Sequence, residues 1–350
     1  MSHQTDDLRI RAITEVRSPK SLHEEIPVSE CASATVYDSR RAIQRILLGE
    51  DDRLLVVVGP CSVHDPRAAL EYAERLKPLR EALAQDLLVV MRVYFEKPRT
   101  TVGWKGLIND PNLDGSFEIN KGLCLARKLL LDLAEMGMPA GTEFLDLISP
   151  QYIADLVSWG AIGARTTESQ GHRELASGLS CPVGFKNATD GDVKVAIDAI
   201  HAAARPHVFM SLTKDGHSAI FSTAGNLDTH IILRGGHRPN YDTESVNIAA
   251  EQIEESGLTP KIMIDFSHAN SRKKPEKQIQ VRQDVSGQIA RGDRRIIGVM
   301  IESNLVAGRQ NADAATGLVY GQSITDACVG WVDTGPMLNE LAQAVARRRG

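Results

Sequence analysis

The sequence lacks the features that mark membrane proteins, secreted proteins and small zinc-binding modules. No apolar run approaches the roughly 18 residues that span a membrane, and the first residues hold neither a basic nor an apolar signal segment. The five cysteines are odd in number and form no Cys-x-x-Cys pair, which argues against a disulfide framework and a zinc knuckle. A net charge of −5 and a pI near 6.1 argue against a general nucleic-acid surface. We therefore expect a cytoplasmic protein without membrane or nucleic-acid partners.

What the chain has is enough apolar sequence for a large core. Of its 350 residues, 42% are hydrophobic and 24% charged. Short apolar runs alternate with amphipathic helical stretches, which is typical of βα units and a parallel sheet. The eight runs are 54–58, 87–93, 139–144, 161–165, 183–186, 230–234, 262–266 and 296–301, and the expected helices are 67–79, 117–136, 150–158, 193–204, 243–256 and 277–291. Because the Gly-x-Gly-x-x-Gly fingerprint of doubly wound sheets is missing, the pattern predicts an α/β protein with a closed (β/α)8 TIM barrel over residues 51–350.

Two segments exceed a minimal barrel. Residues 1–50 form an expected N-terminal extension with a helix near 34–48, and Gly49 follows that helix in the usual place for a C-cap. Residues 207–225 predict an inserted β-hairpin around the turn at Lys214, Asp215 and Gly216. Such additions serve oligomerisation or effector binding; the alternative is that they only pack subunits together.

Polar side chains close every apolar run, at the end of a parallel barrel where ligands bind. One such cation is readily explained as a surface charge, but Arg92, Arg165, Lys186 and Arg234 come from four strands that converge on one face. Burying four cations is costly without a counter-charge, so they favour a ligand carrying phosphate and carboxylate. The segment 97–101, KPRTT, adds two cations and two hydroxyls and predicts a second phosphate site.

A second set of strand-end residues offers a thiol, an imidazole and carboxylates. These residues are Cys61, His268, Glu302 and Asp326. Taken singly, a cysteine after a strand is usually just buried and a histidine is usually structural. Together they suit a divalent transition metal such as manganese, iron, cobalt or zinc. Cys328 lies two residues beyond Asp326, so its pairing with Cys61 on oxidation is a further hypothesis.

Most of these residues, though not Asp326 and Cys328, lie in segments that resemble 3-deoxy-D-arabino-heptulosonate-7-phosphate (DAHP) synthase. The segments are 59–65, 91–106, 163–170, 182–187, 232–236, 265–270 and 301–303. The likeness covers essentially the whole chain, including the extension and the hairpin, and points to the feedback-regulated bacterial type I synthases. One departure is the run NATD at 187–190, where NGTD is expected.

The resemblance implies condensation of phosphoenolpyruvate with erythrose 4-phosphate, the first committed step of the shikimate pathway to aromatic amino acids. It implies one divalent metal per subunit on Cys61, His268, Glu302 and Asp326, and phosphoenolpyruvate held by Arg92, Arg165, Lys186 and Arg234. The implied residues for erythrose 4-phosphate are Lys97, Pro98, Arg99 and Thr100. Lys97 is the candidate for proton transfer and Glu143 for ordering water, while Asp326 joins them at the reacting centre.

The same resemblance implies a homodimer or homotetramer inhibited by an aromatic amino acid, with phenylalanine the first choice and tyrosine the second. The matching effector positions are Asp146, Pro150, Gln151, Leu175, Ser180, Phe209, Ser211 and Phe221, with Asp6 and Asp7 as contributors to the amino group. Two alternatives stay open. One is condensation with a five-carbon sugar phosphate, as in the related 3-deoxy-octulosonate 8-phosphate synthase, and the other is a sugar-phosphate sensor without catalysis.

Overall fold

The computed structural model describes residues 3–99, 103–312 and 317–350 and contains a closed barrel of eight parallel strands. The strands are β1 (Leu54–Gly59), β2 (Leu87–Arg92), β3 (Ala140–Glu143), β4 (Trp159–Ile162), β5 (Val183–Lys186), β8 (Thr229–Leu233), β9 (Ile262–Asp265) and β10 (Ile296–Glu302). Around the barrel each strand pairs with its neighbour along the chain, and β10 pairs with β1 to close the sheet. The predicted (β/α)8 barrel is confirmed.

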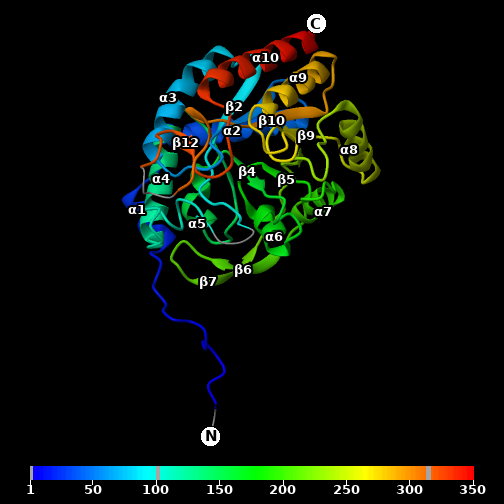
Figure 1. The fold of residues 1–350 in the computed structure, drawn as a ribbon. Helices are drawn as coiled ribbons and strands as arrows, with labels where there is room; N and C mark the ends of the chain where they lie inside the picture. Colours follow the sequence, from blue (N-terminus) through cyan, green and yellow to red (C-terminus); the bar gives the residue numbers. More distant parts are fainter. Residues whose placement is uncertain (1–2, 100–102, 313–316) are drawn as a thin grey trace.

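Helices surround this barrel (Figure 1). They are α3 (Pro66–Ala82), α4 (Ile119–Glu135), α5 (Pro150–Ile153) with the 3-10 turn Ala154–Leu156, α6 (Gln170–Gly178), α7 (Lys194–Ala203), α8 (Thr243–Glu255), α9 (Lys277–Ala290) and α10 (Trp331–Arg349). All eight strands are buried along their whole length, because side chains on one face fill the barrel and those on the other pack under the helices. Near the carboxyl end of the barrel, the short strands β11 (Val306–Arg309) and β12 (Gln322–Ser323) pair with each other.

Two helices precede the barrel, α1 (Pro19–Glu25) and α2 (Glu30–Leu48). Ser29 caps the start of α2 by accepting a hydrogen bond from the Ala32 amide, and Gly49 ends it in the left-handed conformation, with φ of 76°. The inner face of α2 belongs to the same apolar cluster as the barrel interior, through Ile43 and Leu47 on the helix. The amino end of the barrel is therefore closed by a helix that lies outside the repeating βα units.

The predicted hairpin is present between α7 and β8. Its strands β6 (Val208–Leu212) and β7 (Ser218–Ser222) pair antiparallel and stand apart from the barrel sheet. The exposed N-terminal segment, residues 3–16, extends away from the body of the subunit near this hairpin (Figure 1). Among the described residues, no helix is long and apolar enough to cross a membrane.

Most expected boundaries shift by a few residues, and two expected elements differ more clearly from the structure. The strand expected at 161–165 begins earlier, at Trp159, and ends at Ile162. The helix expected at 150–158 is a single α-turn that tightens into a 3-10 turn ending at Leu156. Arg40 on α2 donates hydrogen bonds to the carbonyls of Ala154 and Val157, so the last turn is held by another helix instead of continuing.

Candidate functional site

A cavity of about 170 Å³ lies at the carboxyl end of the barrel and gathers most of the expected phosphate-binding side chains. We call it the barrel cavity. It is lined by Lys97, Pro98, Arg99, Glu143, Gly163, Ala164, Arg165, Lys186, Thr189, Arg234, His268, Lys273 and Asp326. Thr100 lies outside the described residues. Five cations of the expected set thus face one small space, which favours an anionic ligand.

The strands position these cations in two ways. Lys186 ends β5 and Arg234 directly follows β8, so the strand itself aims each side chain. Arg165 comes three residues after β4, in a turn where the Thr166 amide donates to the Gly163 carbonyl. A Cβ on Gly163 would lie 2.3 Å from Oε1 of Glu143, so the glycine makes room for that carboxylate.

Arg92, the fourth cation expected to hold phosphate, is fully buried and is not part of the cavity lining. Its guanidinium lies 3.4 Å from the centre of the Tyr94 ring and donates to the carbonyls of Pro60 and Cys61. Nη2 also pairs with Oε1 of Glu302 at 3.1 Å. Arg92 therefore lies beneath the cavity floor and holds the segment that carries Cys61 against β10.

Three of the four expected metal ligands form a compact cluster. One ligand atom each from Cys61, Glu302 and Asp326 lies within 4.8 Å of the others, and Nε2 of His268 is 3.9 Å from Oε1 of Glu302. A thiol, an imidazole and two carboxylates at this spacing fit a divalent transition metal. Burial, together with the charge of Glu302, raises the pKa of the Cys61 thiol to about 11, so a metal must displace its proton to bind.

Lys97 joins the cation cavity to the metal cluster. Its ammonium donates to Sγ of Cys61 at 3.1 Å and lies 3.8 Å from Oδ2 of Asp326. Burial alone would lower the pKa of Lys97, but the charges of Cys61 and Glu302 hold it above its usual value. Lys97 is therefore a protonated donor at the boundary between the two groups.

His268 occupies a strained position three residues after β9. Its backbone φ is 56°, in the left-handed region that residues other than glycine rarely adopt. Nδ1 of its ring faces Oδ2 of Asp265 at 2.9 Å and Oγ of Ser267 at 2.7 Å. Burial tends to raise the pKa of Asp265, but His268 and Lys186 beside it hold that pKa well below its usual value.

Asp265 and Lys273 are site residues that the sequence interpretation missed. Asp265 interrupts an otherwise apolar run, and a lone acid within a buried strand was an available signal. Lys273 lies in a loop and lines a second cavity, of about 360 Å³, which also includes His268, Glu302 and Asp326. No regular spacing connects Lys273 to the strand ends.

Glu96 is a buried acid that links the loop after β2 to the segment after β3. Its backbone bridges to Gly106, and the Lys97 amide donates to the Lys105 carbonyl at 2.9 Å. Gly106 has φ of 128°, and a Cβ there would lie 1.9 Å from the Phe95 carbonyl oxygen, so only glycine fits. The Glu96 carboxyl accepts a hydrogen bond from Ser149 Oγ at 3.0 Å. Ser149 immediately precedes α5, so the contact joins two loops at the mouth of the barrel.

The protonation of Glu96 gives a testable pH dependence. Burial, with the charges of Asp146 and Glu143, raises its pKa from 4.5 to about 7, although Ser149 opposes the shift. A raised acid pKa contributes stability fully below the unfolded value of 4.5, and that contribution is lost as the pH rises to about 7. Against Glu96→Gln, the wild type should lose about 3 kcal/mol of unfolding free energy between pH 4.5 and pH 8. Urea unfolding of both proteins at several pH values measures this, and parallel curves would contradict it.

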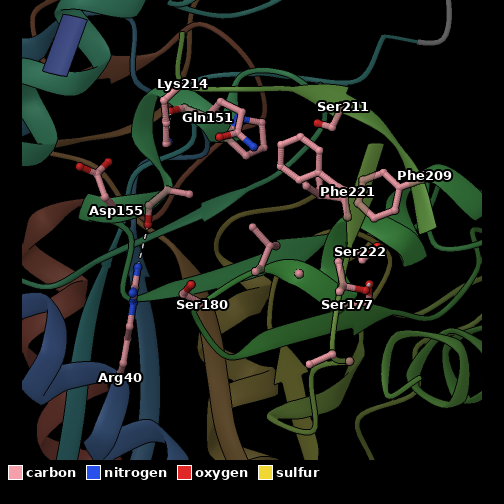
Figure 2. A pocket seen from close by; sticks show the side chains of 18 residues that line it. Arg40, Gln151, Asp155, Ser177, Ser180, Phe209, Ser211, Lys214, Phe221 and Ser222 are labelled. Atoms are coloured by element: carbon pink, nitrogen blue, oxygen red, sulfur yellow. Dashed lines mark hydrogen bonds between the residues drawn. The ribbon is translucent and has the colours of Figure 1, made fainter. Parts of the chain in front are cut away.

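A cavity of about 680 Å³ lies between the hairpin, α5 and α6, and we call it the hairpin cavity. Seven of the expected effector residues line it: Pro150, Gln151, Leu175, Ser180, Phe209, Ser211 and Phe221. Figure 2 shows the rings of Phe209 and Phe221 side by side on one wall, with centroids 6.2 Å apart. Asp155 and Lys214 lie toward the opposite side, and Arg40 reaches in from α2 (Figure 2).

The other three expected effector residues lie elsewhere. Asp146 does not line the hairpin cavity, and its carboxylate accepts from the amides of Ile148 and Ser149 at 2.6 and 2.8 Å, which holds the chain leading into α5. Asp6 and Asp7 belong to the exposed N-terminal segment. The sequence interpretation in turn missed Arg40, Asp155 and Lys214, which come from separate elements and share no motif.

The hairpin cavity combines groups that complement a zwitterion with a flat ring. Asp155 pairs with Arg127 at 2.8 Å, and although burial tends to raise the pKa of Asp155, this pairing keeps it below the usual value. Lys214 donates to the Gln151 carbonyl, and burial lowers its pKa. An anion and a cation at one side and stacked phenyl rings at the other match an aromatic amino acid.

Comparison with known proteins agrees with this geometry. The chain is 63% identical over 350 residues to the Phe-sensitive phospho-2-dehydro-3-deoxyheptonate aldolase of Escherichia coli (strain K12), covering 100% of both. It is 56% identical to the tyrosine-inhibited enzyme of Schizosaccharomyces pombe, covering 98% of this chain and 94% of that one. A solved structure of the aldolase from Francisella tularensis SCHU S4 superimposes with a TM-score of 0.95 at 54% identity, covering 97% of this chain and 100% of the other. A model of the DAHP synthetase I family matches residues 25–339. The chain therefore belongs to the DAHP synthetase I family.

Proposed function

We propose that the protein condenses phosphoenolpyruvate with erythrose 4-phosphate to give DAHP and inorganic phosphate. The observation that carries this proposal is the barrel cavity, where cations for two phosphates adjoin a Cys/His/carboxylate cluster at the end of a TM barrel. Membership of the DAHP synthetase I family supports the same reaction.

In this proposal, Arg165, Lys186 and Arg234 hold the phosphate and carboxylate of phosphoenolpyruvate by charge-assisted hydrogen bonds. Arg92, the fourth residue of this expected set, does not line the cavity and pairs with Glu302 of the proposed metal site. Pro98 and Arg99 also line the cavity, and with Thr100 they would receive the phosphate of erythrose 4-phosphate. Two anions bound in this way bring C3 of phosphoenolpyruvate and the aldehyde carbon together.

The donor set fits one divalent ion held by Cys61, His268, Glu302 and Asp326. When bound there, the ion supplies Lewis-acid polarisation of an aldehyde oxygen. Manganese, iron, cobalt and zinc all suit a thiolate, an imidazole and two carboxylates, so the geometry selects no single metal.

Lys97 is placed to donate the proton that the reaction needs. Attack of C3 of phosphoenolpyruvate on the aldehyde carbon forms the new C–C bond and leaves an alkoxide, which takes a proton from the Lys97 ammonium. Glu143 orients the water that adds at C2 and accepts its proton. Cleavage of the C2–O bond then releases inorganic phosphate and leaves the 2-keto product.

Removing single cations tests the assignment of phosphoenolpyruvate. Arg165→Ala or Arg234→Ala should raise the KM for phosphoenolpyruvate by about tenfold to a hundredfold, since each lost charge-assisted contact is worth about 1.5–3 kcal/mol. The KM for erythrose 4-phosphate should change less. Arg291→Ala, at an exposed arginine following α9, is the matched control and should leave both values unchanged. The opposite pattern would mean that the two phosphate sites are exchanged.

Product analysis tests the reaction itself. Phosphate release should require both substrates, and mass spectrometry should find the seven-carbon product from the four-carbon aldose phosphate. An eight-carbon product formed preferentially from a five-carbon sugar phosphate would instead support the alternative reaction, that of a 3-deoxy-octulosonate 8-phosphate synthase. Ligand binding without phosphate release would identify a sensor.

Regulation is the second part of the proposal. The hairpin cavity would bind an aromatic amino acid, and phenylalanine is the first choice because the 63%-identical relative is named Phe-sensitive. Tyrosine is the second, since a 56%-identical relative is named tyrosine-inhibited. The rings of Phe209 and Phe221 would stack on the effector, while Lys214 and Asp155 would meet its charges.

The proposed assembly is a homodimer or homotetramer in which the N-terminal segment of one subunit covers the hairpin of another. Exposed apolar side chains on both partners support this: Leu8, Ile10 and Ile13 on the segment, and Val208, Met210 and Ile220 on the hairpin. Asp6 and Asp7 would then reach a neighbour's hairpin cavity. Analytical ultracentrifugation measures the assembly.

Coupling between the two cavities would run through the segment from Glu143 to α5. Pro150 and Gln151 line the hairpin cavity, and the preceding Ser149 donates to Glu96 next to Lys97. An effector that shifts α5 would therefore displace Glu96 and Lys97 without entering the barrel cavity.

Deleting residues 1–15 tests the proposed role of the N-terminal segment in inhibition by an aromatic amino acid. The truncated enzyme should lose inhibition by phenylalanine while keeping most of its turnover, because no described residue of this segment lines the barrel cavity and the hydrogen bond from the Arg17 amide to Asn120 remains. Tyrosine and tryptophan are assayed in parallel, and sedimentation shows whether the oligomer survives. Unchanged inhibition by the same amino acid would make the segment merely structural.

A further inference from the structure

Asp265, the last residue of β9, is a fully buried acid to which the proposed reaction assigns no role. Its Oδ2 lies 2.9 Å from Nδ1 of His268 and 3.1 Å from Nζ of Lys186. Its Oδ1 accepts hydrogen bonds from the Ser267 amide at 3.0 Å and from Ser267 Oγ at 2.6 Å. Burying a carboxylate costs several kcal/mol in desolvation unless such partners compensate it. The positions of the protons on Ser267, His268 and Lys186 must therefore suit a negative charge on Asp265.

The hydrogen-bond pattern fixes the tautomer of His268. Ser267 has one hydroxyl proton and donates it to Asp265, so its oxygen can only accept from the histidine ring. Oδ2 of Asp265 makes no hydrogen bond, but it lies 2.9 Å from Nδ1, and its negative charge likewise favours a proton there. Nδ1 therefore carries a proton, and the lone pair of a neutral His268 ring is on Nε2, which faces Glu302.

The backbone conformation of His268 needs the support of the contacts around it. His268 has φ of 56°, a conformation that costs a residue with a side chain about 1–3 kcal/mol and persists only where its surroundings impose it. The turn that Asp265 closes with the Ser267 amide lies immediately before His268. The Lys273 amide donates to the His268 carbonyl at 2.7 Å and closes the loop on the other side.

We propose that Asp265 is a positioning residue that directs Nε2 of His268 toward the metal and holds the same carboxylate against Lys186. The inference rests on the proposed metal site. It assigns Asp265 no contact with substrate. The buried carboxylate would support both His268, a proposed metal ligand, and Lys186, a proposed phosphoenolpyruvate-binding residue. The ring N–H bonds to Ser267 Oγ, which in turn donates to Asp265, and such outer partners of a ligating histidine orient its ring and raise its basicity.

Metal affinity tests this role separately from turnover. Asp265→Asn keeps the size of the side chain but removes the charge, and it should weaken binding of Co²⁺ by about tenfold to a hundredfold. Competition with a chromophoric chelator measures the affinity, and the thiolate-to-cobalt absorption of the loaded protein should change in intensity or position. Asp293→Asn is the matched control, because Asp293 is also paired, to Arg295 at 2.7 Å, but lies just before β10 at the other end of the barrel. It should bind Co²⁺ as the wild type does.

Each outcome separates the inference from the metal assignment. Wild-type and Asp265→Asn proteins that bind Co²⁺ within twofold of each other would overturn the positioning role. A wild-type chain that binds no Co²⁺ would overturn the metal site itself, and the inference with it. If Asp265→Asn does not fold, Ser267→Ala decides the question: its affinity should fall by about tenfold, and an unchanged affinity would overturn the proposal.

Discussion

Cys61→Ala should lower the metal-dependent turnover by about a thousandfold or more while leaving the fold intact. The side chain is fully buried beside Glu302 and Asp326, so its loss removes a proposed metal ligand without touching the strands of the barrel. Lewis-acid stabilisation is worth several kcal/mol, and each 1.36 kcal/mol is about a tenfold change in rate. His268→Ala should have the same effect through the loss of Nε2.

The measurement compares chelator-treated wild type and variants with manganese, cobalt or zinc added back, and circular dichroism checks the fold. Cys181→Ala is the matched control, because Cys181 is also buried but lies outside the residues that line the barrel cavity. It should keep wild-type turnover. Full activity of Cys61→Ala in the presence of chelator would refute the metal assignment.

Arg92→Met should destabilise the metal-free protein by about 3–5 kcal/mol, the usual cost of removing one partner of a buried ion pair. The variant leaves Glu302, only 1% exposed, without the guanidinium that now lies 3.1 Å from Oε1. It also removes the hydrogen bonds that fix the carbonyls of Pro60 and Cys61. Urea unfolding in chelator reports the loss without the stabilisation that a bound metal adds.

A double variant distinguishes the ion pair from simple packing. Arg92→Met combined with Glu302→Gln should recover part of the lost unfolding free energy, because the unpaired charge is then gone. If the two substitutions instead add independently, the contact between Arg92 and Glu302 contributes little. A loss below about 1 kcal/mol for Arg92→Met alone would show that the pair is not a major support of the barrel floor.

The charged residues at the strand ends could be predicted because the end of a strand itself directs the side chain into the site. Glu143, Lys186 and Glu302 are the last residues of β3, β5 and β10, so an apolar run that stops at a charge is enough to place them. Arg165 and His268 come three residues after a strand, where only a specific turn brings the side chain back to the site. The pattern of apolar runs indicated both residues as strand ends, but it did not predict the turns that separate them from β4 and β9.

Other features depend on contacts that no local pattern encodes. Gly160 lies outside the strand expected at 161–165, yet a Cβ there would lie 2.5 Å from the Phe144 ring, so the glycine is a packing requirement of β4. The hairpin cavity draws Arg40 from α2, Asp155 from the turn after α5 and Lys214 from the hairpin. Each is an ordinary surface residue in the sequence, and only the tertiary arrangement brings them to one space.

The helix that closes the amino end of the barrel also determines when the subunit can complete its folding. Ile43 and Leu47 on α2 pack in one cluster with Ile297 and Met300 on β10, near the other end of the chain. During synthesis α2 emerges early, but its apolar face has no complete binding surface until the last barrel strand has been made. Contacts between such distant parts of a chain form slowly, and transiently exposed apolar surface favours aggregation. We therefore expect nascent chains that end before β10 to keep α2 exposed and to depend on chaperones, whereas the full-length subunit buries it.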